Sequence, residues 1–498
     1  MRLAGAVACA LTVGAALQPP AATPPEVPGG ATARDLVREQ ALAAKVQPSI
    51  ALANVRELVA LGPRLGGTPS GKRAARLLAG KMRDLGLAVE VLIDPPMKTH
   101  VEKKWQVLFD GKPLASAWPY NFSPPVARTT ARLELLPAGT EQPSKDLEGA
   151  FVLTSSPVGP EASLRMARAG AVALLTDAPA DPNRYVDWAP IGSVEREGAD
   201  ETGVALFGLS YRDGRRLRDA LAAASAPVHL TIELESETFM GRPRTVVGTL
   251  SGAGRMSNEI LIVCAHGDSD SGGPGADDNA SGVASLVEVA RALTGAAAEG
   301  ALPADRPSVK FIIWGAEYHS SKAWVVEHRA EIPRIRAVIN YDETGTGAER
   351  DAVYYEGNDI PWNENLLRTI EAVADDHAGR LGFPTAWTSN PALGGTDAYT
   401  FLPRDHGGEG LTDVKVPSTT VFSGAWDKPT RVPQTAGWKS KGWPEQGDLF
   451  IDYSAFYHSS GDTPANTTEA EPWNMERCAK LVTVALYRIM SQSAPPRR

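Results

Sequence analysis

The segment that most constrains this chain is a buried-strand pattern that ends in a cluster of metal-ligand side chains. An apolar run over residues 260–265 stops at His266, and Asp268 follows two positions later. A glycine-rich loop with two further aspartates, Asp277 and Asp278, then precedes an amphipathic helical pattern. The order strand, polar loop, helix is typical of an open α/β sheet, in which ligands bind at the carboxyl ends of strands. One imidazole with several carboxylates at that edge favours a divalent metal.

Two later strand patterns end in the same kinds of side chain. The run over residues 309–314 is followed by Glu317, the run over residues 337–341 is followed by Asp342, and His458 comes late in a polar segment. Each residue alone has an ordinary alternative, because a single acid or histidine after a strand is often a solvated or turn-forming group. The repetition at successive strand ends favours one shared site.

The chemistry of this set suits hydrolysis. Two imidazoles and two carboxylates, from His266, His458, Asp278 and Asp342, are a ligand set for one or two zinc ions. Two ions that share a bridging carboxylate lie about 3.5–4 Å apart and hold a hydrolytic water between them. Glu317 is then left as a free carboxylate that can act as general base.

These motifs resemble the M28 family of co-catalytic zinc exopeptidases. The resemblance rests on the segments 266–269 (HGDS), 275–282 (GADDNASG), 315–317 (GAE), 340–342 (NYD) and 457–463 (YHSSGDT). It implies that His266 and Asp342 bind one zinc, that His458 binds the other and that Asp278 bridges them. It also implies that Glu317 is the general base and that Asp268 orients His266 through its second ring nitrogen.

One position departs from the family pattern. The family usually places a second glutamate after the base, where it ligates the zinc held by His458, and here that residue is Tyr318. A phenol has an unperturbed pKa of about 10 and is rarely a zinc ligand. Three outcomes are open: His319 ligates instead, Tyr318 ligates as phenolate, or the second site binds weakly. We expect His319 or a weak second site rather than phenolate.

A turn near residue 396 resembles a substrate-pocket turn of the family. We predict that Asp397 and Tyr399 bind the substrate, and that Asp397 could hold a free α-amino group. For Asp397 the ordinary alternative is a turn cap.

The chain divides into two main parts. We expect an α/β fold with a mixed central sheet flanked by helices, of the zinc-exopeptidase (phosphorylase/hydrolase-like) type, with an inserted strand-rich domain that resembles a protease-associated (PA) domain. The predicted boundaries are a signal peptide at 1–22, a disordered leader at 23–34, peptidase segments at 35–114 and 241–492, the insert at 115–240 and a tail at 493–498.

Localisation and partners follow from the termini and the charge. Arg2 followed by an uncharged run over residues 3–17 is typical of an export signal, so we expect a periplasmic or extracellular protein without stable membrane insertion after cleavage. The net charge of −9 argues against nucleic acid as a partner. Cys264 and Cys478, the cysteines beyond the signal, are expected to be small buried groups rather than a disulfide.

The predicted function is that of an exported exopeptidase that hydrolyses terminal peptide bonds of a peptide substrate, most simply an aminopeptidase, with metal-activated water and Glu317 as base. The expected cofactor is Zn²⁺ at two sites, the second weaker, with Mn²⁺ or Co²⁺ as alternatives. A carboxypeptidase, a dipeptidase or a single-zinc glutaminyl cyclase would use the same scaffold. The substitution at Tyr318 also leaves open a catalytically impaired binding protein.

Overall fold

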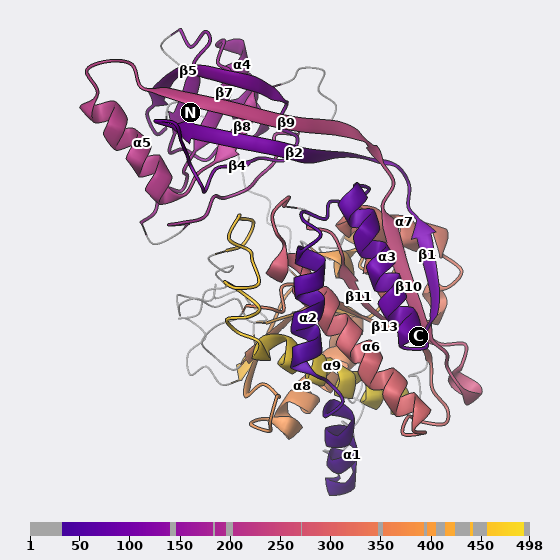
Figure 1. Cartoon of the computed structure of the whole chain (residues 1–498). Helices are drawn as coiled ribbons and strands as arrows, with labels where there is room; N and C mark the ends of the chain where they lie inside the picture. The colour runs from indigo at the N-terminus through magenta and orange to yellow at the C-terminus, as the bar shows by residue number, and fades with distance from the viewer. Residues whose placement is uncertain are drawn as a thin grey trace, which may run out of the picture.

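The computed structural model describes residues 32–139, 146–182, 185–195, 203–269, 271–346, 352–392, 396–404, 414–423, 439–441 and 456–492. Within them the chain forms a helix-flanked sheet and a smaller strand-rich body (Figure 1). The predicted signal peptide, nearly all of the predicted leader and the tail lie outside the described residues. No described helix is both long and apolar enough to cross a bilayer.

A nine-stranded sheet forms the centre of the larger body. Its strands are β1 (Ala88–Ile93), β10 (Arg244–Leu250), β12 (Ser308–Trp314), β11 (Ile260–His266), β13 (Ile335–Tyr341), β16 (Ser418–Ser423), β14 (Ala352–Glu356), β15 (Ala386–Asn390) and β17 (Lys439–Lys441), in that spatial order. β11 pairs in parallel with β12 and β13, whereas β1, β10 and β17 pair antiparallel with their neighbours. The mixed α/β sheet that the sequence predicts is therefore confirmed.

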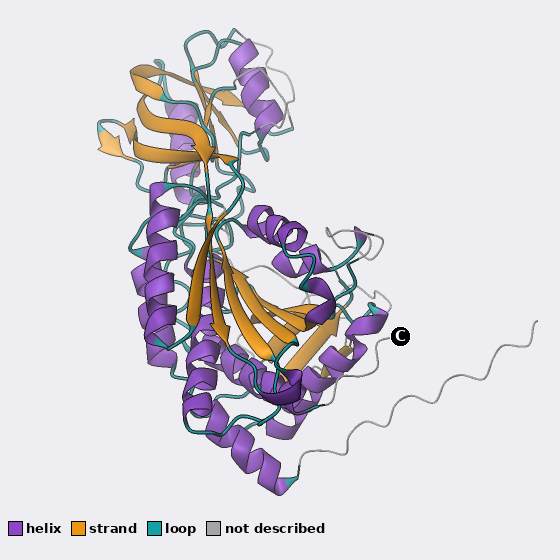
Figure 2. Cartoon of the chain, turned by 90° about the vertical axis from the view of Figure 1, so that its right-hand side faces the viewer, coloured by secondary structure: helices purple, strands orange, loops and turns teal. Residues whose placement is uncertain are grey.

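Helices cover both faces of this sheet (Figure 2). They are α1 (Ala33–Ala43), α2 (Pro48–Val59), α3 (Pro69–Asp84), α6 (Gly282–Ala298), α7 (Glu317–Glu327), α8 (Glu364–His377) and α9 (Trp473–Ser491). Alternate residues of β11 enter different cores: Leu261 and Val263 pack with α6 and α9, and Ile262 and Cys264 pack on the side of α7. This period-two alternation of a strand decides which side chains share a face at its end.

The insert is an eight-stranded sheet with two helices. Its strands are β3 (Lys112–Pro113), β2 (Met97–Phe109), β9 (His229–Gly241), β5 (Val126–Leu136), β6 (Phe151–Thr154), β7 (Ala173–Thr176), β8 (Ala205–Gly208) and β4 (Trp118–Pro119), in that spatial order. The helices are α4 (Pro160–Arg168) and α5 (Tyr211–Ala223). The long pair of β2 and β9 leads from this body toward the larger one (Figure 1).

The insert begins earlier than the sequence predicts. The predicted boundary lies at residue 115, whereas β2 begins at Met97 and pairs along its length with β9. β2 mixes lysines with apolar residues on an exposed sheet face, so no break in composition marks its start. β14 and β15 were also absent from the prediction, since these short strands depend on their neighbours in the sheet.

Two smaller features are clear in the structure. Helix α3 is capped by Thr68, whose Oγ1 accepts a hydrogen bond from Gly71 N at 3.1 Å. Pro69 occupies the first helical turn, where its missing N–H costs nothing. Cys264 and Cys478 are both free and buried, as expected.

A buried ion cluster ties the first helix to the last two. Glu39 on α1 accepts hydrogen bonds from Arg488 Nε at 2.7 Å and from His377 Nε2 at 2.8 Å. Burial alone raises the pKa of Glu39, but these hydrogen bonds and charges lower it overall below 4.5. The carboxylate therefore stabilises the folded chain above that pH, and its contribution is lost as the pH falls through the lower folded pKa.

We predict that Glu39→Gln lowers the free energy of unfolding by about 3 kcal/mol near neutral pH, because Arg488 loses a buried partner. Urea titrations should show the difference from the parent shrinking below pH 4.5. Glu57→Gln is the matched control, since its pair with Lys81 is solvent-exposed and should contribute less than about 1 kcal/mol. An equal effect of both substitutions would contradict the account.

Candidate metal centre

The register of two parallel strands brings the first ligands together. Cys264 on β11 pairs with Asn340 on β13, and each of His266 and Asp342 comes two residues later along the chain, His266 as the last residue of β11 and Asp342 directly after β13. A shift of two residues keeps a side chain on the same sheet face. His266 and Asp342 therefore leave the sheet on one face at adjacent strand ends, where His266 Nε2 lies 3.4 Å from Asp342 Oδ1.

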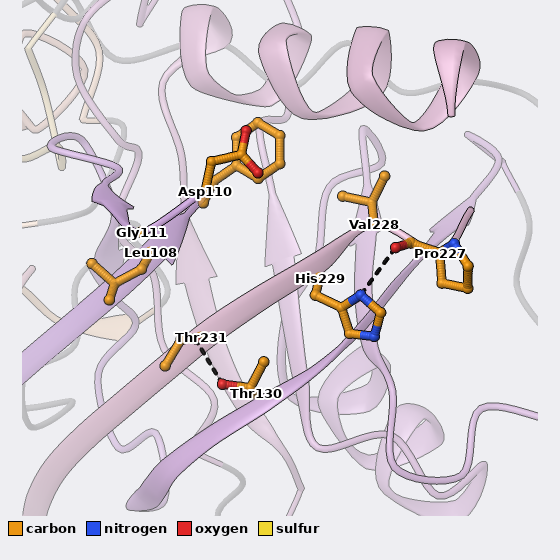
Figure 3. A pocket seen from close by; sticks show the side chains of 9 residues that line it. Leu108, Asp110, Gly111, Thr130, Pro227, Val228, His229 and Thr231 are labelled. Atoms are coloured by element: carbon orange, nitrogen blue, oxygen red, sulfur yellow. Dashed lines mark hydrogen bonds between the residues drawn. The ribbon is translucent and has the colours of Figure 1, made fainter. Parts of the chain in front are cut away.

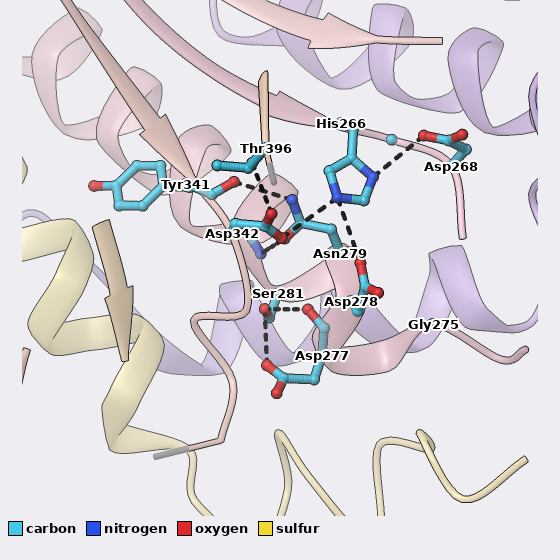
Figure 4. A network of polar contacts seen from close by, with 12 residues as sticks. His266, Asp268, Gly275, Asp277, Asp278, Asn279, Ser281, Tyr341, Asp342 and Thr396 are labelled. Carbon is cyan, nitrogen blue, oxygen red and sulfur yellow. Dashed lines mark hydrogen bonds and ion pairs between the residues drawn. The ribbon is translucent and has the colours of Figure 1, made fainter. Parts of the chain in front are cut away.

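The structure gathers three predicted residues, Asp268, Asp278 and Asp342, around His266 (Figure 4). His266 Nε2 lies 3.4 Å from Asp278 Oδ1, and its Nδ1 lies 3.2 Å from Asp268 Oδ1. The imidazole thus presents one nitrogen to two carboxylates while Asp268 holds the other. Among the described residues, His266, Asp278 and Asp342 form the one group of three whose ligand atoms lie within 4.8 Å of one another.

Asp278 lies between two histidines. Its Oδ1 faces His266, and its Oδ2 lies 3.1 Å from His458 Nε2. A carboxylate that offers one oxygen to each of two imidazole-bearing positions has the arrangement of a bridging ligand. Asp277, the residue before Asp278, instead accepts hydrogen bonds from Gly345 N at 2.7 Å and from Ser281 Oγ at 3.2 Å.

An oxygen of Asp342 fits a metal ligand. Asp342 Oδ2 accepts a hydrogen bond from Thr396 Oγ1 at 2.8 Å, and Thr396 in turn accepts from Asn340 Nδ2 at 2.8 Å. Asp342 Oδ1 is buried and accepts no hydrogen bond from any described residue. A buried carboxylate oxygen without a donor is costly unless a cation satisfies it. The donor set of imidazole and carboxylates is one that zinc takes.

The loop that carries Asp278 is fixed from both sides. Asp462 accepts hydrogen bonds from the backbone N–H groups of Asp277 at 2.7 Å and Asp278 at 3.1 Å. Asn279, whose peptide bond with Asp278 is cis, donates from Nδ2 to Tyr341 O at 3.0 Å. The backbone is non-helical at Asp278 and Asn279, and α6 begins at Gly282, directly after this loop. The carboxylate of Asp278 is therefore held by groups from β13 and from the segment after His458.

A buried arginine, which the sequence did not single out, supports the same loop. Arg64 has 0% of its surface exposed and donates to Pro274 O at 2.9 Å and to Gly275 O at 2.6 Å. Burial lowers its pKa to about 10, while Asp462 and other nearby carboxylates oppose that shift. Arg64 therefore stays charged and partly balances the acidic cluster. Its distance in sequence from the motifs explains why it was missed.

The residues after β12 take different directions. Glu317 is the first residue of α7, at a helix N-terminus that favours the charged carboxylate. Tyr318 packs against a small apolar cluster of Ile360, Tyr399 and Leu402. His319 Nε2 lies 2.9 Å from Pro95 O, so the structure directs this imidazole to a backbone carbonyl and not to the metal-type cluster. The expectation that His319 replaces the family glutamate does not fit this placement.

The two predicted substrate contacts are buried. Asp397 begins a 3₁₀ turn (Asp397–Phe401) and is 0% exposed, so it cannot line an open pocket as expected. Burial raises its pKa well above the usual range, a shift that His266 opposes and Asp342 reinforces. Tyr399 is buried as well, and its hydroxyl donates to Glu356.

The field at His266 is strongly negative. Burial alone lowers the pKa of this imidazole, but Asp342, Asp268 and Glu317 together raise it well above its usual value. Asp277 shows the same crowding, because burial raises its pKa to about 7 and Asp278 adds to the shift. Such a concentration of buried carboxylates around one imidazole favours a bound cation.

A pocket of about 460 Å³ lies elsewhere, on the insert (Figure 3). It is lined by the end of β2, the following turn at Asp110 and Gly111, and residues of β5 and β9. None of the metal-type residues lines it. This pocket and the acidic cluster are therefore separate features.

Comparison with known families agrees with this geometry. Residues 245–483 match the family model described as peptidase family M28. The matched segment contains His266, Asp278, Glu317, Asp342 and His458.

This part of the chain belongs to peptidase family M28.

Several relatives of this M28 segment are fungal. The leucine aminopeptidase 2 of Trichophyton equinum is 28% identical over 285 residues, which cover 54% of this chain and 49% of the relative. The probable leucine aminopeptidase 2 of Aspergillus oryzae is 25% identical over 301 residues, covering 59% and 54%. The chain spans about half the length of the curated relatives it matches.

Solved structures share the fold over most of this chain. A zinc aminopeptidase from Bacillus subtilis aligns with a TM-score of 0.60 at 21% identity, covering 91% of this chain and 97% of that one. An M28 peptidase precursor from Shewanella amazonensis aligns with a TM-score of 0.63 at 18% identity, covering 93% and 100%. At these identities the likeness establishes the fold, which extends over most of this chain.

We predict that Arg64→Lys lowers the free energy of unfolding by about 2 kcal/mol, because the shorter side chain with its compact ammonium cannot reproduce the planar fork that reaches both loop carbonyls, and one carbonyl is left unsatisfied. Urea unfolding measures the change. Arg73→Lys is the control, since its guanidinium donates to Leu61 O at the protein surface. If Arg64→Lys were as stable as this control, the hydrogen bonds from Arg64 to the carbonyls of Pro274 and Gly275 would contribute nothing to stability.

Proposed function

We propose that the chain is a metal-dependent aminopeptidase that removes the N-terminal residue of a peptide. The observation that carries this proposal is the placement of Asp278 between His266 and His458, at 3.4 Å and 3.1 Å, beside the unsatisfied oxygen of Asp342. The leucine aminopeptidases among the M28 relatives support cleavage at the amino end. Export, predicted from the N-terminal residues, is part of the same proposal.

The ligand groups divide into two unequal sites in this proposal. His266, Asp278 and Asp342 would hold one zinc ion, and a zinc ion held there supplies Lewis-acid chemistry for hydrolysis. Asp278 Oδ2 and His458 Nε2 would contribute to a second site. Tyr318 packs against an aromatic and aliphatic group at the position where the family places a glutamate. We therefore propose a tight first site and a weaker second one.

Two carboxylates would have separate roles: Glu317 would transfer a proton, and Asp268 would orient His266. Glu317, at the start of α7, takes a proton from the attacking water and passes it to the leaving amine. Asp268 accepts from His266 Nδ1 and so fixes the tautomer that leaves Nε2 free for a metal. Thr396 performs a similar task for Asp342 by donating to its Oδ2.

We predict that Glu317→Gln lowers kcat for leucine nitroanilide at least about 100-fold, because the amide cannot accept a proton. The bound zinc, measured by mass spectrometry, should stay near the parent value, since Glu317 is not one of the proposed ligands. Chelation should abolish the parent activity, and added zinc should restore it. Full activity of the variant, or of the chelated parent, would contradict the proposal.

The end of the substrate that is recognised can be tested with blocked peptides. N-acetylation should abolish cleavage and C-terminal amidation should be tolerated. The reverse pattern would indicate a carboxypeptidase on the same scaffold.

We predict that Tyr318→Glu tightens the second zinc about 10-fold, because it restores the carboxylate that the family places at this position as a ligand of that zinc. Calorimetric titration of the zinc-free protein measures both binding steps. His319→Ala is the control and should leave both steps unchanged, since its imidazole bonds to Pro95 O. Loss of the second step in His319→Ala would instead make His319 a ligand.

A further inference from the structure

The insert makes direct contact with the loop that carries His458. Pro190 of the insert forms an antiparallel bridge with Ser459, one residue after the histidine. Ile191 N donates to the carbonyl of His458 itself at 2.7 Å, and Ser460 N donates to Ala189 O at 2.9 Å. The backbone of the proposed ligand is thus hydrogen-bonded to a segment of the other body.

Side chains extend this contact in both directions. Ala189 N donates to Ser460 Oγ at 2.9 Å, and Tyr185 Oη donates to Tyr457 O at 3.3 Å. A Cβ placed on Gly461 would lie 2.5 Å from Trp188 Cγ, so the indole packs directly on the glycine backbone. No larger residue fits at that position without moving one of the two segments.

The backbone at His458 needs such support. Its φ is +47°, in the left-handed region that non-glycine residues seldom adopt and that costs about 1 kcal/mol or more. A residue in that conformation persists where surrounding contacts fix it. On one flank the loop is tied to Asp278 through Asp462, and on the other flank it is tied to the insert.

We propose that the insert positions His458 for the second metal, through the segment Trp188–Ile191. This inference rests on the proposed metal-binding function of His458. Its physical basis is the cost of ordering a metal ligand. If the loop is not held in place before the ion binds, the free energy needed to order it is subtracted from the binding free energy of the ion. Trp188 and its neighbours are positioning residues, and the insert is a structural part of the metal centre.

The test replaces Trp188 by Ala, which removes the indole from Gly461. In the zinc-free protein, peptides covering residues 456–462 should exchange amide hydrogen faster than in the parent. The second zinc should bind about 10-fold more weakly, whereas the first, at His266, Asp278 and Asp342, stays unchanged. Trp188→Phe, which keeps an aromatic ring, should recover most of both effects.

Two further variants sharpen the experiment. Asp187→Ala is the matched control, because Asp187 pairs with Arg212 inside the insert at 2.7 Å, and both readouts should match the parent. Gly461→Ala should lower the affinity for the second zinc when it is made in the parent. The same substitution should lower that affinity less in Trp188→Ala, because the indole that the new Cβ would clash with is absent.

The outcomes separate this inference from the proposed function. Unchanged exchange of residues 456–462 in Trp188→Ala, or an unchanged second zinc step, would overturn the positioning role. If the parent binds a single zinc, the two-site proposal fails. Unchanged amide exchange of residues 456–462 in Trp188→Ala would then also reject the claim that the insert holds the loop of His458 in place. Faster amide exchange in Trp188→Ala, together with a lower affinity for the second zinc, supports the positioning role of the insert.

Discussion

The structure depends on confining several carboxylates to one buried edge of a sheet. Asp277, Asp278, Asp342 and Asp462 each have 6% or less of their surface exposed. Carboxylates at such depth repel one another and lose the solvation that favours their charge. Backbone N–H groups, hydroxyls and the buried Arg64 offset part of this cost. Asp342 Oδ1 accepts no hydrogen bond within the described residues and has only His266 Nε2, at 3.4 Å, beside it, so part of the cost remains and a divalent cation accounts for it best.

The parallel strands decide where this cluster forms. β11 and β13 run side by side in register, so their carboxyl ends deliver His266 and Asp342 to one place. The loop into α6 then carries Asp278 beneath both. A third contribution comes from outside the sheet, because the insert and Asp462 share the loop of His458. The two bodies of the chain thus meet at the proposed second metal position.

The sequence predicted the parts of this arrangement that follow from local periodicity. Strands β11, β12 and β13 are apolar runs that end in polar groups, so the approach of His266, Asp278 and Asp342 could be foreseen. The direction that a side chain takes beyond the end of a strand could not be predicted from the sequence. His319 turns to Pro95 because the first turn of α7 sets its direction, and helix phase depends on tertiary packing. The contact between the insert and His458 joins segments far apart in sequence, which no local pattern encodes.

The central claim is that the strand-edge cluster is a metal centre, and anomalous X-ray scattering at the zinc edge tests it most directly. Crystals of the zinc-loaded protein should show a strong peak bounded by His266, Asp278 and Asp342, with a weaker peak between Asp278 and His458. Absence of density at the first position, or zinc bound only away from these side chains, would contradict the account.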